Sequence, residues 1–263
     1  MGYLVRIKAF LTVCMALCLT ACVTTNEVTG RSQFITIPAS QDEALGLQAL
    51  NEVKKSNRNV RTSGRDVERV RRIGERIVRV SDKPNMNWEF IVIDEPVLNA
   101  WALPGGKVAV YSKMIDNLTD EELAAVLGHE AAHAILRHGA EQVSRAQAQQ
   151  LAIVGLGAVV GATTENEKNA QLAVALGSMA AQGFVALPHS RNMELEADHV
   201  GTIYMARAGY DPRAAAELWR KMARLKEGGG SQPTFLSTHP SDDKRISRIE
   251  NRMPEYLAIY EQH

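Results

Sequence analysis

Several kinds of residue are scarce in this sequence, and each scarcity excludes a class of protein. All 3 cysteines lie within the first 22 residues, so no disulfide can hold the rest of the chain, and the fold must depend on packing or on a metal ion. Neither sign of charge is in excess, with 30 Lys and Arg against 30 Asp and Glu, so no basic field marks nucleic acid as a partner. No apolar run is long enough to cross a bilayer comfortably. With 263 residues, of which 45% are apolar and 23% charged, the chain is instead typical of a globular protein with a substantial core.

Residues 1–21 have the layout of a secretory signal, in which Arg6 and Lys8 precede an apolar run and small residues precede Cys22. The run Leu-Thr-Ala-Cys that ends at Cys22 resembles a bacterial lipobox, with an ordinary signal peptide and an incidental cysteine as the alternative. We therefore expect a lipoprotein signal peptide over 1–21, a lipidated N-terminus and tether over 22–45, and one domain over 46–263. Cys22 would then anchor the chain to a membrane. Val23 after Cys22 resembles an outer-membrane sorting signal, which predicts a bacterial envelope protein that faces the periplasm.

The spacing of apolar residues predicts the secondary structure of this domain. Helical periodicity over 43–80, broken near 56–64, predicts two helices. Strands are expected over 88–94 and 107–111, joined through a Pro-Gly-Gly turn. Thr119 and Glu122 have the spacing of a capping box, which predicts a helix that begins at Asp120 and runs past Arg137. Further helices are expected over 191–208, over 212–227 and from about 241. Two apolar stretches, 151–162 and 172–187, are interpreted as helices that cover the core or the site, with a membrane-dipping hairpin as the alternative.

The helix that begins at Asp120 carries an H-E-x-x-H pattern over residues 129–133. Residues i and i+4 lie on one face of a helix, so the imidazoles of His129 and His133 can bind one ion. Glu130 points about 100° away from His129, which keeps its carboxylate near the ion and leaves it able to contact water. A catalytic zinc ion needs this division of roles, because zinc lowers the pKa of its bound water to about 7 and a carboxylate takes the proton.

A catalytic zinc ion also needs a third protein ligand, and Glu194 is the candidate. Glu194 and Asp198 share one face of a predicted helix at i and i+4. Like charges at this spacing repel each other, which favours a cation or a histidine between them over a solvated acidic pair. Glu194 is therefore predicted to bind the ion and Asp198 to accept a hydrogen bond from a ligand histidine. Glu196, between them, is predicted to face solvent.

These motifs together resemble the zinc metalloproteases of the HtpX and CAAX prenyl endopeptidase family, in which E-x-x-x-D follows H-E-x-x-H by about sixty residues. The runs 129–138, 190–191, 238–240 and 245–246 resemble its bacterial periplasmic lipoprotein and mitochondrial Oma-type members. The resemblance covers residues from about 30 to 249 and implies one Zn²⁺ per chain, bound by His129, His133 and Glu194, with Glu130 as general base. The chain departs from some relatives in lacking long hydrophobic spans and a C-terminal repeat domain, which weakens any transfer of substrate or partner.

The remaining histidines are interpreted one by one. In the family a Thr-His-Pro element lies near the metal, so His239 is a candidate to stabilise the oxyanion or to occupy the open zinc position and hold the enzyme shut. A plain loop histidine is the third possibility. His138 is turned away from the ligand face of the predicted helix and is interpreted as structural or solvated. His189 is a second polar group for the cleft, and His199 and His263 are interpreted as surface residues.

The segment 99–106 and the strand over 107–111 resemble the substrate-binding edge of the family, to which an extended peptide adds as a further strand. The residues concerned are Asn99, Gly105, Gly106, Val108 and Val110. An ordinary hairpin in the core is an equally good interpretation of the same residues. If the edge interpretation holds, the substrates have to be locally extended or unfolded.

The sequence as a whole predicts an α+β fold: a mainly helical, zincin-like metalloprotease domain with a small β-sheet beside the H-E-x-x-H helix. The predicted function is that of a membrane-tethered zinc metalloendopeptidase. Its partners would be unfolded or misassembled envelope polypeptides and, through the lipid anchor, a membrane; the quality-control role rests on analogy. The alternative is a zinc-containing, chaperone-like binding lipoprotein with latent or self-inhibited protease activity.

Overall fold

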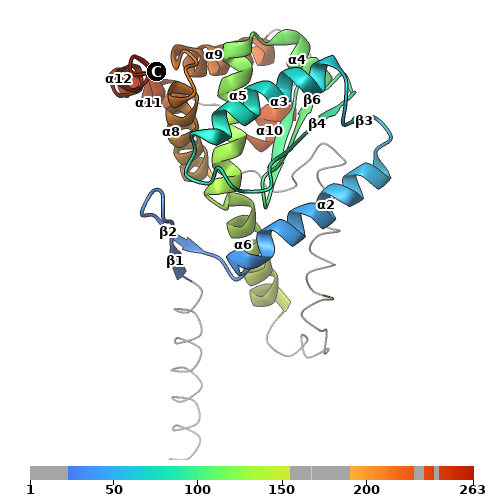
Figure 1. Cartoon of the computed structure of the whole chain (residues 1–263). Coiled ribbons are helices and arrows are strands. Elements are labelled where there is room, and N and C mark those ends of the chain that lie inside the picture. Colours follow the sequence, from blue (N-terminus) through green and yellow to red (C-terminus); the bar gives the residue numbers. More distant parts are fainter. Residues whose placement is uncertain (1–22, 155–166, 168–189, 228–233, 240–242) are drawn as a thin grey trace, which may run out of the picture.

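The computed structural model describes residues 23–154, 167, 190–227, 234–239 and 243–263. The signal segment, Cys22, His189 and most of the two apolar stretches after residue 150 lie outside the described residues. The described part confirms a mainly helical α+β domain with a small sheet (Figure 1).

A four-stranded sheet has the order β3 (Val60–Arg61), β4 (Glu89–Ile93), β6 (Lys107–Tyr111), β5 (Ala100–Leu103). β4 and β6 are parallel, and β5 pairs with β6 as an antiparallel hairpin. Gly105 and Gly106 form the tight turn between β5 and β6 with φ of 68° and 78°, which L side chains rarely adopt. The strands predicted over 88–94 and 107–111 are confirmed. β5 lies within the segment 99–106 and forms with β6 the hairpin that was one of the two interpretations of these residues.

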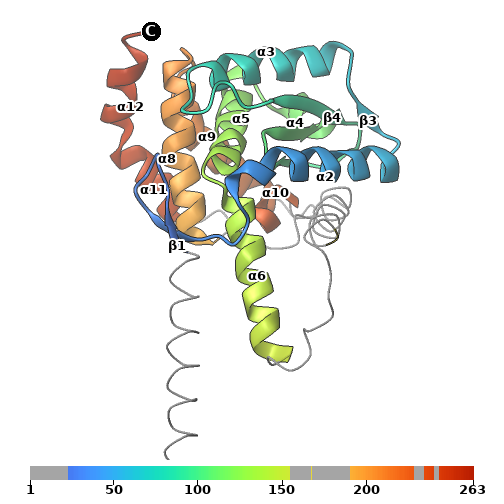
Figure 2. The same ribbon diagram turned by 60° about the horizontal axis from the view of Figure 1, so that its bottom comes forward.

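Helices cover both faces of this sheet (Figure 2). Side chains alternate along β4, so Phe90 and Val92 pack toward α3 (Arg65–Arg79) and α5 (Asp120–Ile135). Ile91 and Ile93 face the opposite way and pack with α2 (Asp42–Ser56). The two helices predicted over 43–80 are confirmed as α2 and α3, and the short helix α4 (Ser112–Asn117) follows β6.

The helix α5 begins where the capping box predicts and ends earlier than expected. The Thr119 hydroxyl accepts a hydrogen bond from the Glu122 N–H, and the Glu122 carboxylate accepts one from the Thr119 N–H. The expectation that the helix runs past Arg137 is wrong, because Arg137 has φ of 58° and α6 (His138–Val154) starts directly after it. The Arg137 guanidinium donates to the Asp42 carboxylate at 2.6 and 2.9 Å, which holds the corner in place.

The N-terminal segment, expected to form a tether, packs on this α5–α6 corner. It consists of the hairpin β1 (Val23–Thr25) and β2 (Ser32–Phe34), followed by a 3-10 turn (Ala39–Gln41). Gln33 is buried and donates to the Leu136 carbonyl oxygen at 2.8 Å. Ile35 and Ile37 are buried as well and pack with Leu45 and Ala140, so the end of this segment belongs to the packed domain.

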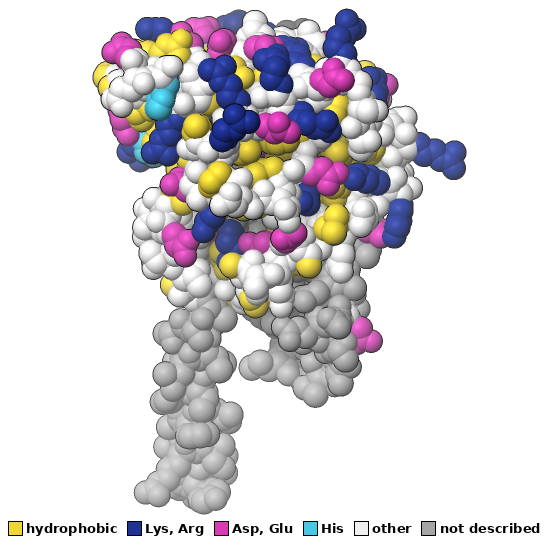
Figure 3. Space-filling view, viewed as in Figure 1, with side chains coloured by type: hydrophobic (Ala, Val, Ile, Leu, Met, Phe, Trp, Pro, Cys, Tyr) yellow, Lys and Arg dark blue, Asp and Glu magenta, His cyan; other side chains and the backbone are white. Residues whose placement is uncertain are grey.

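The C-terminal helices pack on the other side of α5. Ser190 caps α8 (Arg191–Arg207), which ends before Gly209 in a left-handed conformation, as predicted. α9 (Arg213–Glu227) and α10 (Thr234–Thr238) follow. The single helix expected from about residue 241 is two helices, α11 (Asp243–Asn251) and α12 (Met253–Tyr260). Within the described residues, no helix combines the length and the apolar character that a membrane span requires. Charged side chains of both signs are interspersed on the face in Figure 3.

Candidate metal centre

Two helices in very close contact build the centre. α5 and α8 cross at Gly128 and Gly201, where a Cβ atom added to either glycine would lie about 2.6 Å from the backbone of the other helix. This approach brings His129 of α5 near the first turns of α8, which carry Glu194 and Asp198. The residue after α10, His239, completes the group. Segments distant in sequence thus supply one compact cluster.

The donor atoms of four buried residues converge there. One ligand atom each from His129, His133, Glu194 and His239 lie within 4.8 Å of one another. Nε2 of His129 is 2.9 Å from Nε2 of His133, and each of these atoms is 3.4 Å from a carboxylate oxygen of Glu194. Imidazole nitrogens and a carboxylate oxygen crowded in this way are the donors of a zinc site, so the cluster fits one zinc ion.

The electrostatics of the cluster favour positive charge at its centre. Burial alone would lower the pKa of His129, but the Asp198 and Glu194 carboxylates outweigh it and raise this pKa to about 9. Burial likewise opposes ionisation of Glu194, yet Arg245 and the surrounding imidazoles hold its pKa well below the usual carboxyl range. Anionic Glu194 and Asp198 therefore remain charged in a buried position, where a cation offsets them.

Glu130 lies beside the cluster and outside it. Its carboxylate is 1% exposed, and Oε1 makes no hydrogen bond to any described residue. Oε1 of Glu130 lies 3.4 Å from Nε2 of His239, which belongs to the cluster. Burial raises the pKa of Glu130 above the usual carboxyl value. A carboxylate with a raised pKa and a free lone pair is suited to accept a proton at neutral pH.

Asp198 lies where the sequence predicts, with Oδ1 at 3.0 Å from Nδ1 of His129. The sequence does not identify Arg245 as a site residue, although Arg245 lies in the run 245–246 that contributes to the family resemblance. It is fully buried and donates to both Asp198 oxygens at 2.6 and 2.7 Å and to Glu194 at 2.7 Å. Its guanidinium also lies 3.5 Å from the ring centroid of Trp219. Two acidic side chains one turn apart and buried require such a counter-charge, which is the signal that could have revealed it.

Comparison with known proteins agrees with this geometry. A model of peptidase family M48 matches residues 65–253, which include every member of the cluster. The chain belongs to peptidase family M48. The resemblance to zinc metalloproteases is thus confirmed at the level of the family.

Curated members of the family share this region. The mitochondrial metalloendopeptidase OMA1 of Schizosaccharomyces pombe is 40% identical over 187 residues, which are 71% of this chain and 52% of that protein. The human OMA1 is 32% identical over 179 residues, 67% of this chain and 34% of that protein. The beta-barrel assembly-enhancing protease of Yersinia pestis is 30% identical over 183 residues, 68% of this chain and 37% of that protein. This M48 chain spans about half the length, or less, of these relatives.

Two interpretations of polar residues in this M48 chain, those of Glu196 and His199, need correction. Glu196 does not face solvent: its side chain is 10% exposed and contacts Arg31, Thr29 and His138. His138 is fully buried, as the structural interpretation requires, but it lies on α6 and its Nδ1 is 2.9 Å from Nδ1 of His133. His199 is half-buried and contacts the Tyr256 hydroxyl at 2.9 Å, whereas His263 is exposed as expected.

The substrate-edge interpretation also changes. Val108 and Val110 belong to β6, which is an interior strand with β4 on one side and β5 on the other, so they cannot pair with a peptide. Asn99 is buried directly before β5, and the two glycines form the hairpin turn. Among the described strands, β5 is the last one of the sheet on this side. A small pocket between the end of β5 and α5 is lined by Leu103, Pro104 and His133.

Proposed function

We propose that this protein is a zinc-dependent endopeptidase that hydrolyses unfolded polypeptides. The observation that carries the proposal is the convergence of His129, His133 and Glu194 on one point, with the buried carboxylate of Glu130 beside them. These three residues would hold the ion. When bound, zinc polarises a peptide carbonyl and lowers the pKa of water to about 7.

The protein's own groups carry the proton transfers in this proposal. A Glu130 carboxylate oxygen takes the proton from the attacking water and delivers it to the nitrogen of the leaving amine. Asp198 fixes the proton of His129 on Nδ1, so that Nε2 presents its lone pair to the cluster. Arg245 keeps Asp198 ionised for that task, because it lies within hydrogen-bond distance of both carboxylate oxygens.

The edge strand β5 is the proposed docking site for the substrate backbone. An added strand gains main-chain hydrogen bonds with little demand on sequence, so the substrates are locally unfolded chains. α10 lies at the start of β5, where the Phe235 N–H donates to the Leu98 carbonyl oxygen at 2.9 Å. A peptide along β5 would therefore pass between α10 and the HExxH helix.

The proposed setting is the bacterial envelope. A lipid on Cys22 would tether the domain to the outer membrane on the periplasmic side, where unfolded or misassembled envelope proteins are the substrates. Two findings support this setting: the lipobox-like run before Cys22, and a relative whose name refers to β-barrel assembly. Attachment of acyl chains at Cys22, detected by mass spectrometry of the protein from a bacterial host, tests it; an unmodified Cys22 would contradict it.

Removal of the metal provides the direct test of the proposed activity. The purified protein is expected to contain about one zinc ion per chain and to cleave casein, and 1,10-phenanthroline should abolish cleavage. One equivalent of zinc should restore it after the chelator is removed. Cleavage that persists in metal-free protein would refute the proposal.

The position of His239 supports a self-inhibited form of this enzyme. Its Nδ1 lies 3.2 Å from Nε2 of His129 and 3.1 Å from the Glu194 carboxylate, so it occupies the fourth donor position of the cluster. A structural zinc site has four protein ligands, whereas a catalytic one keeps a position open. We therefore propose that activity requires His239 to withdraw.

His239→Ala is expected to increase the rate of casein hydrolysis several-fold, because it opens the fourth position. Zinc content should remain near one ion per chain, since three donors stay in place. The hydrolysis rate and the zinc content are measured on the same preparation. A fall in hydrolysis with zinc retained would instead assign His239 to stabilisation of the oxyanion.

A further inference from the structure

We propose that Glu196 and His138 form a positioning pair for His133, and that Thr29 and Arg31 of the N-terminal hairpin hold this pair in place. The hairpin β1–β2 would then help to fix the orientation of a zinc ligand. The inference rests on the proposed role of His133 as a zinc ligand. It assigns a role to buried polar groups that the proposed reaction does not use.

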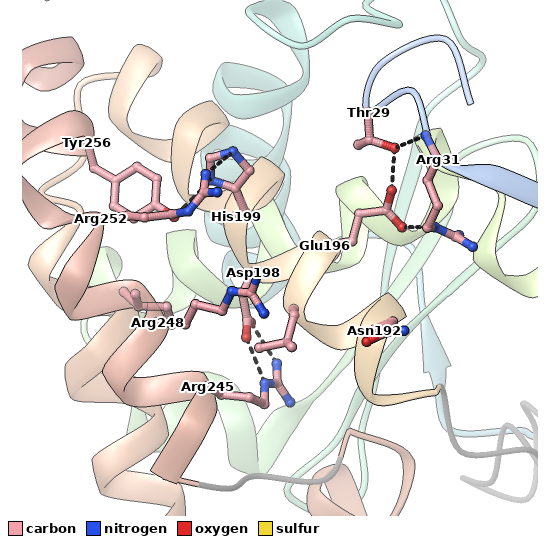
Figure 4. Close-up of a pocket in the computed structure, with 12 residues that line it drawn as sticks. Thr29, Arg31, Asn192, Glu196, Asp198, His199, Arg245, Arg248, Arg252 and Tyr256 are labelled. Atoms are coloured by element: carbon pink, nitrogen blue, oxygen red, sulfur yellow. Dashed lines mark hydrogen bonds and ion pairs between the residues drawn. The ribbon is translucent and has the colours of Figure 1, made fainter. Parts of the chain in front are cut away.

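The contacts form one continuous chain from the cluster to the hairpin. Nδ1 of His133 is 2.9 Å from Nδ1 of His138, and Nε2 of His138 is 3.1 Å from Oε2 of Glu196. Oε2 of Glu196 also accepts from Nε of Arg31 at 2.6 Å, and its Oε1 accepts from the Thr29 hydroxyl. Figure 4 shows Glu196 directed toward Thr29 and Arg31. His138 is fully buried, so these contacts are made away from solvent.

The arrangement is compatible with only one distribution of protons once His133 binds through Nε2. Nε2 of His133 faces His129 and Glu194, so its Nδ1 carries the proton and donates it to Nδ1 of His138. The proton of His138 is then on Nε2, where it donates to the Glu196 carboxylate. Both bonds are satisfied with His138 neutral. Glu196 thus fixes the tautomer and the ring orientation of His133 through His138.

The same logic applies to the other ligand histidine. His129 contacts Asp198, which is backed by Arg245, and His133 reaches Glu196, which is backed by Arg31. In Figure 4 the two carboxylates leave α8 in different directions, each toward its own arginine. Each ligand histidine is therefore connected, directly or through His138, to a carboxylate of α8 that pairs with an arginine. The difference is that Arg31 comes from the hairpin, about a hundred residues before either histidine.

The hairpin also fixes the corner that carries His138. Arg31 donates to both oxygens of Glu141 on α6, at 2.7 and 3.1 Å, and Gln33 donates to Glu141 at 3.0 Å. Arg31 therefore bridges α6 and α8, the two helices that carry His138 and Glu196. The hairpin begins at Val23, the residue next to the proposed lipid site. Displacement of the hairpin would remove Thr29 and Arg31 from Glu196 and so loosen the hold of Glu196 on His138.

Zinc affinity of the full chain in detergent, measured by competition with a chromogenic chelator, tests the pair without any substrate. Glu196→Ala is expected to lower the affinity 10- to 100-fold, as loss of such outer partners does in other zinc sites. The absorption spectrum of the Co²⁺-substituted protein should change as well, because the orientation of the His133 ring is no longer fixed. Glu196→Gln keeps an acceptor for His138 and should recover most of the affinity. Arg31→Ala should lower the zinc affinity less than Glu196→Ala, because Arg31 is the partly exposed, outermost member of this chain of contacts.

Glu122→Ala is the matched control. It removes a carboxylate of similar burial, 13% exposed in its side chain, whose hydrogen bonds join Thr119 and Lys221 at the start of α5. It should lower the melting temperature while zinc affinity and the Co²⁺ spectrum stay those of the wild type. Wild-type affinity and spectrum in Glu196→Ala, or an equal loss in Glu122→Ala, would overturn the positioning role. A wild-type protein that binds zinc without cleaving casein would count against the proposed activity alone.

Discussion

Glu130→Gln is expected to lower the rate of casein hydrolysis by about 10²- to 10⁴-fold while the protein keeps about one zinc ion per chain. The amide has the shape of the carboxylate and fits the same buried position, so the packing around α5 should be preserved. It cannot accept a proton from water, however. Glu130 is not one of the four converging donors, so zinc binding should not change. Hydrolysis rate and zinc content are measured on the same preparation.

The control for this substitution is Glu121→Gln on the same helix. Glu121 is exposed in the first turn of α5, and its carboxylate accepts a hydrogen bond from the Asp211 N–H, remote from the cluster. This variant should cleave casein at the wild-type rate. Wild-type hydrolysis in Glu130→Gln would show that another group is the base. Loss of zinc together with activity would show that Glu130 holds the site together instead of accepting the proton.

The parts of the fold that the sequence predicts correctly are those determined by short-range signals. The start of α5 depends on Thr119 and Glu122, three residues apart, and the capping box forms as expected. The end of α8 depends on Gly209, which adopts the left-handed conformation that a glycine allows. The i and i+4 spacing within each helix likewise brings His129 and His133 together, and Glu194 lies opposite them.

The features of the fold and of the site that the sequence does not predict depend on contacts between residues far apart in the chain. Nothing near Arg137 marks the end of α5, because the conformation is held by Asp42 and the Ile37 carbonyl, about a hundred residues earlier. The position of Glu196 on its helix predicts a solvent-facing side chain. Arg31, which pairs with Glu196 and covers it, belongs to the distant hairpin. The sequence left β6 equally compatible with a substrate edge and with a core hairpin, and the pairing of β5 with β6 decides for the hairpin. Local periodicity carries no information on such contacts.

The close contact of α5 and α8 leads to a second large effect, in Gly201→Ala. A Cβ atom there would lie 2.6 Å from the carbonyl carbon of Gly128 and 2.7 Å from the amide nitrogen of His129. These are backbone atoms inside a helix and cannot move aside alone, so the two helices must separate. We expect the free energy of unfolding to fall by about 2–3 kcal/mol. Zinc affinity should fall by at least tenfold, because the same separation moves Glu194 away from His129 and His133.

Gly139→Ala on α6 is the matched control, because nothing lies within 4 Å of the added Cβ atom there. Alanine favours a helix over glycine by up to about 1 kcal/mol, so this variant should be slightly more stable than the wild type. The same preference acts at Gly201, where only the contact with Gly128 opposes it. Opposite signs of the two changes, measured by denaturant unfolding, would therefore isolate the helix contact. If Gly201→Ala were also stabilising and bound zinc normally, α5 and α8 would not be in backbone contact, and the cluster would have to be assembled in another way.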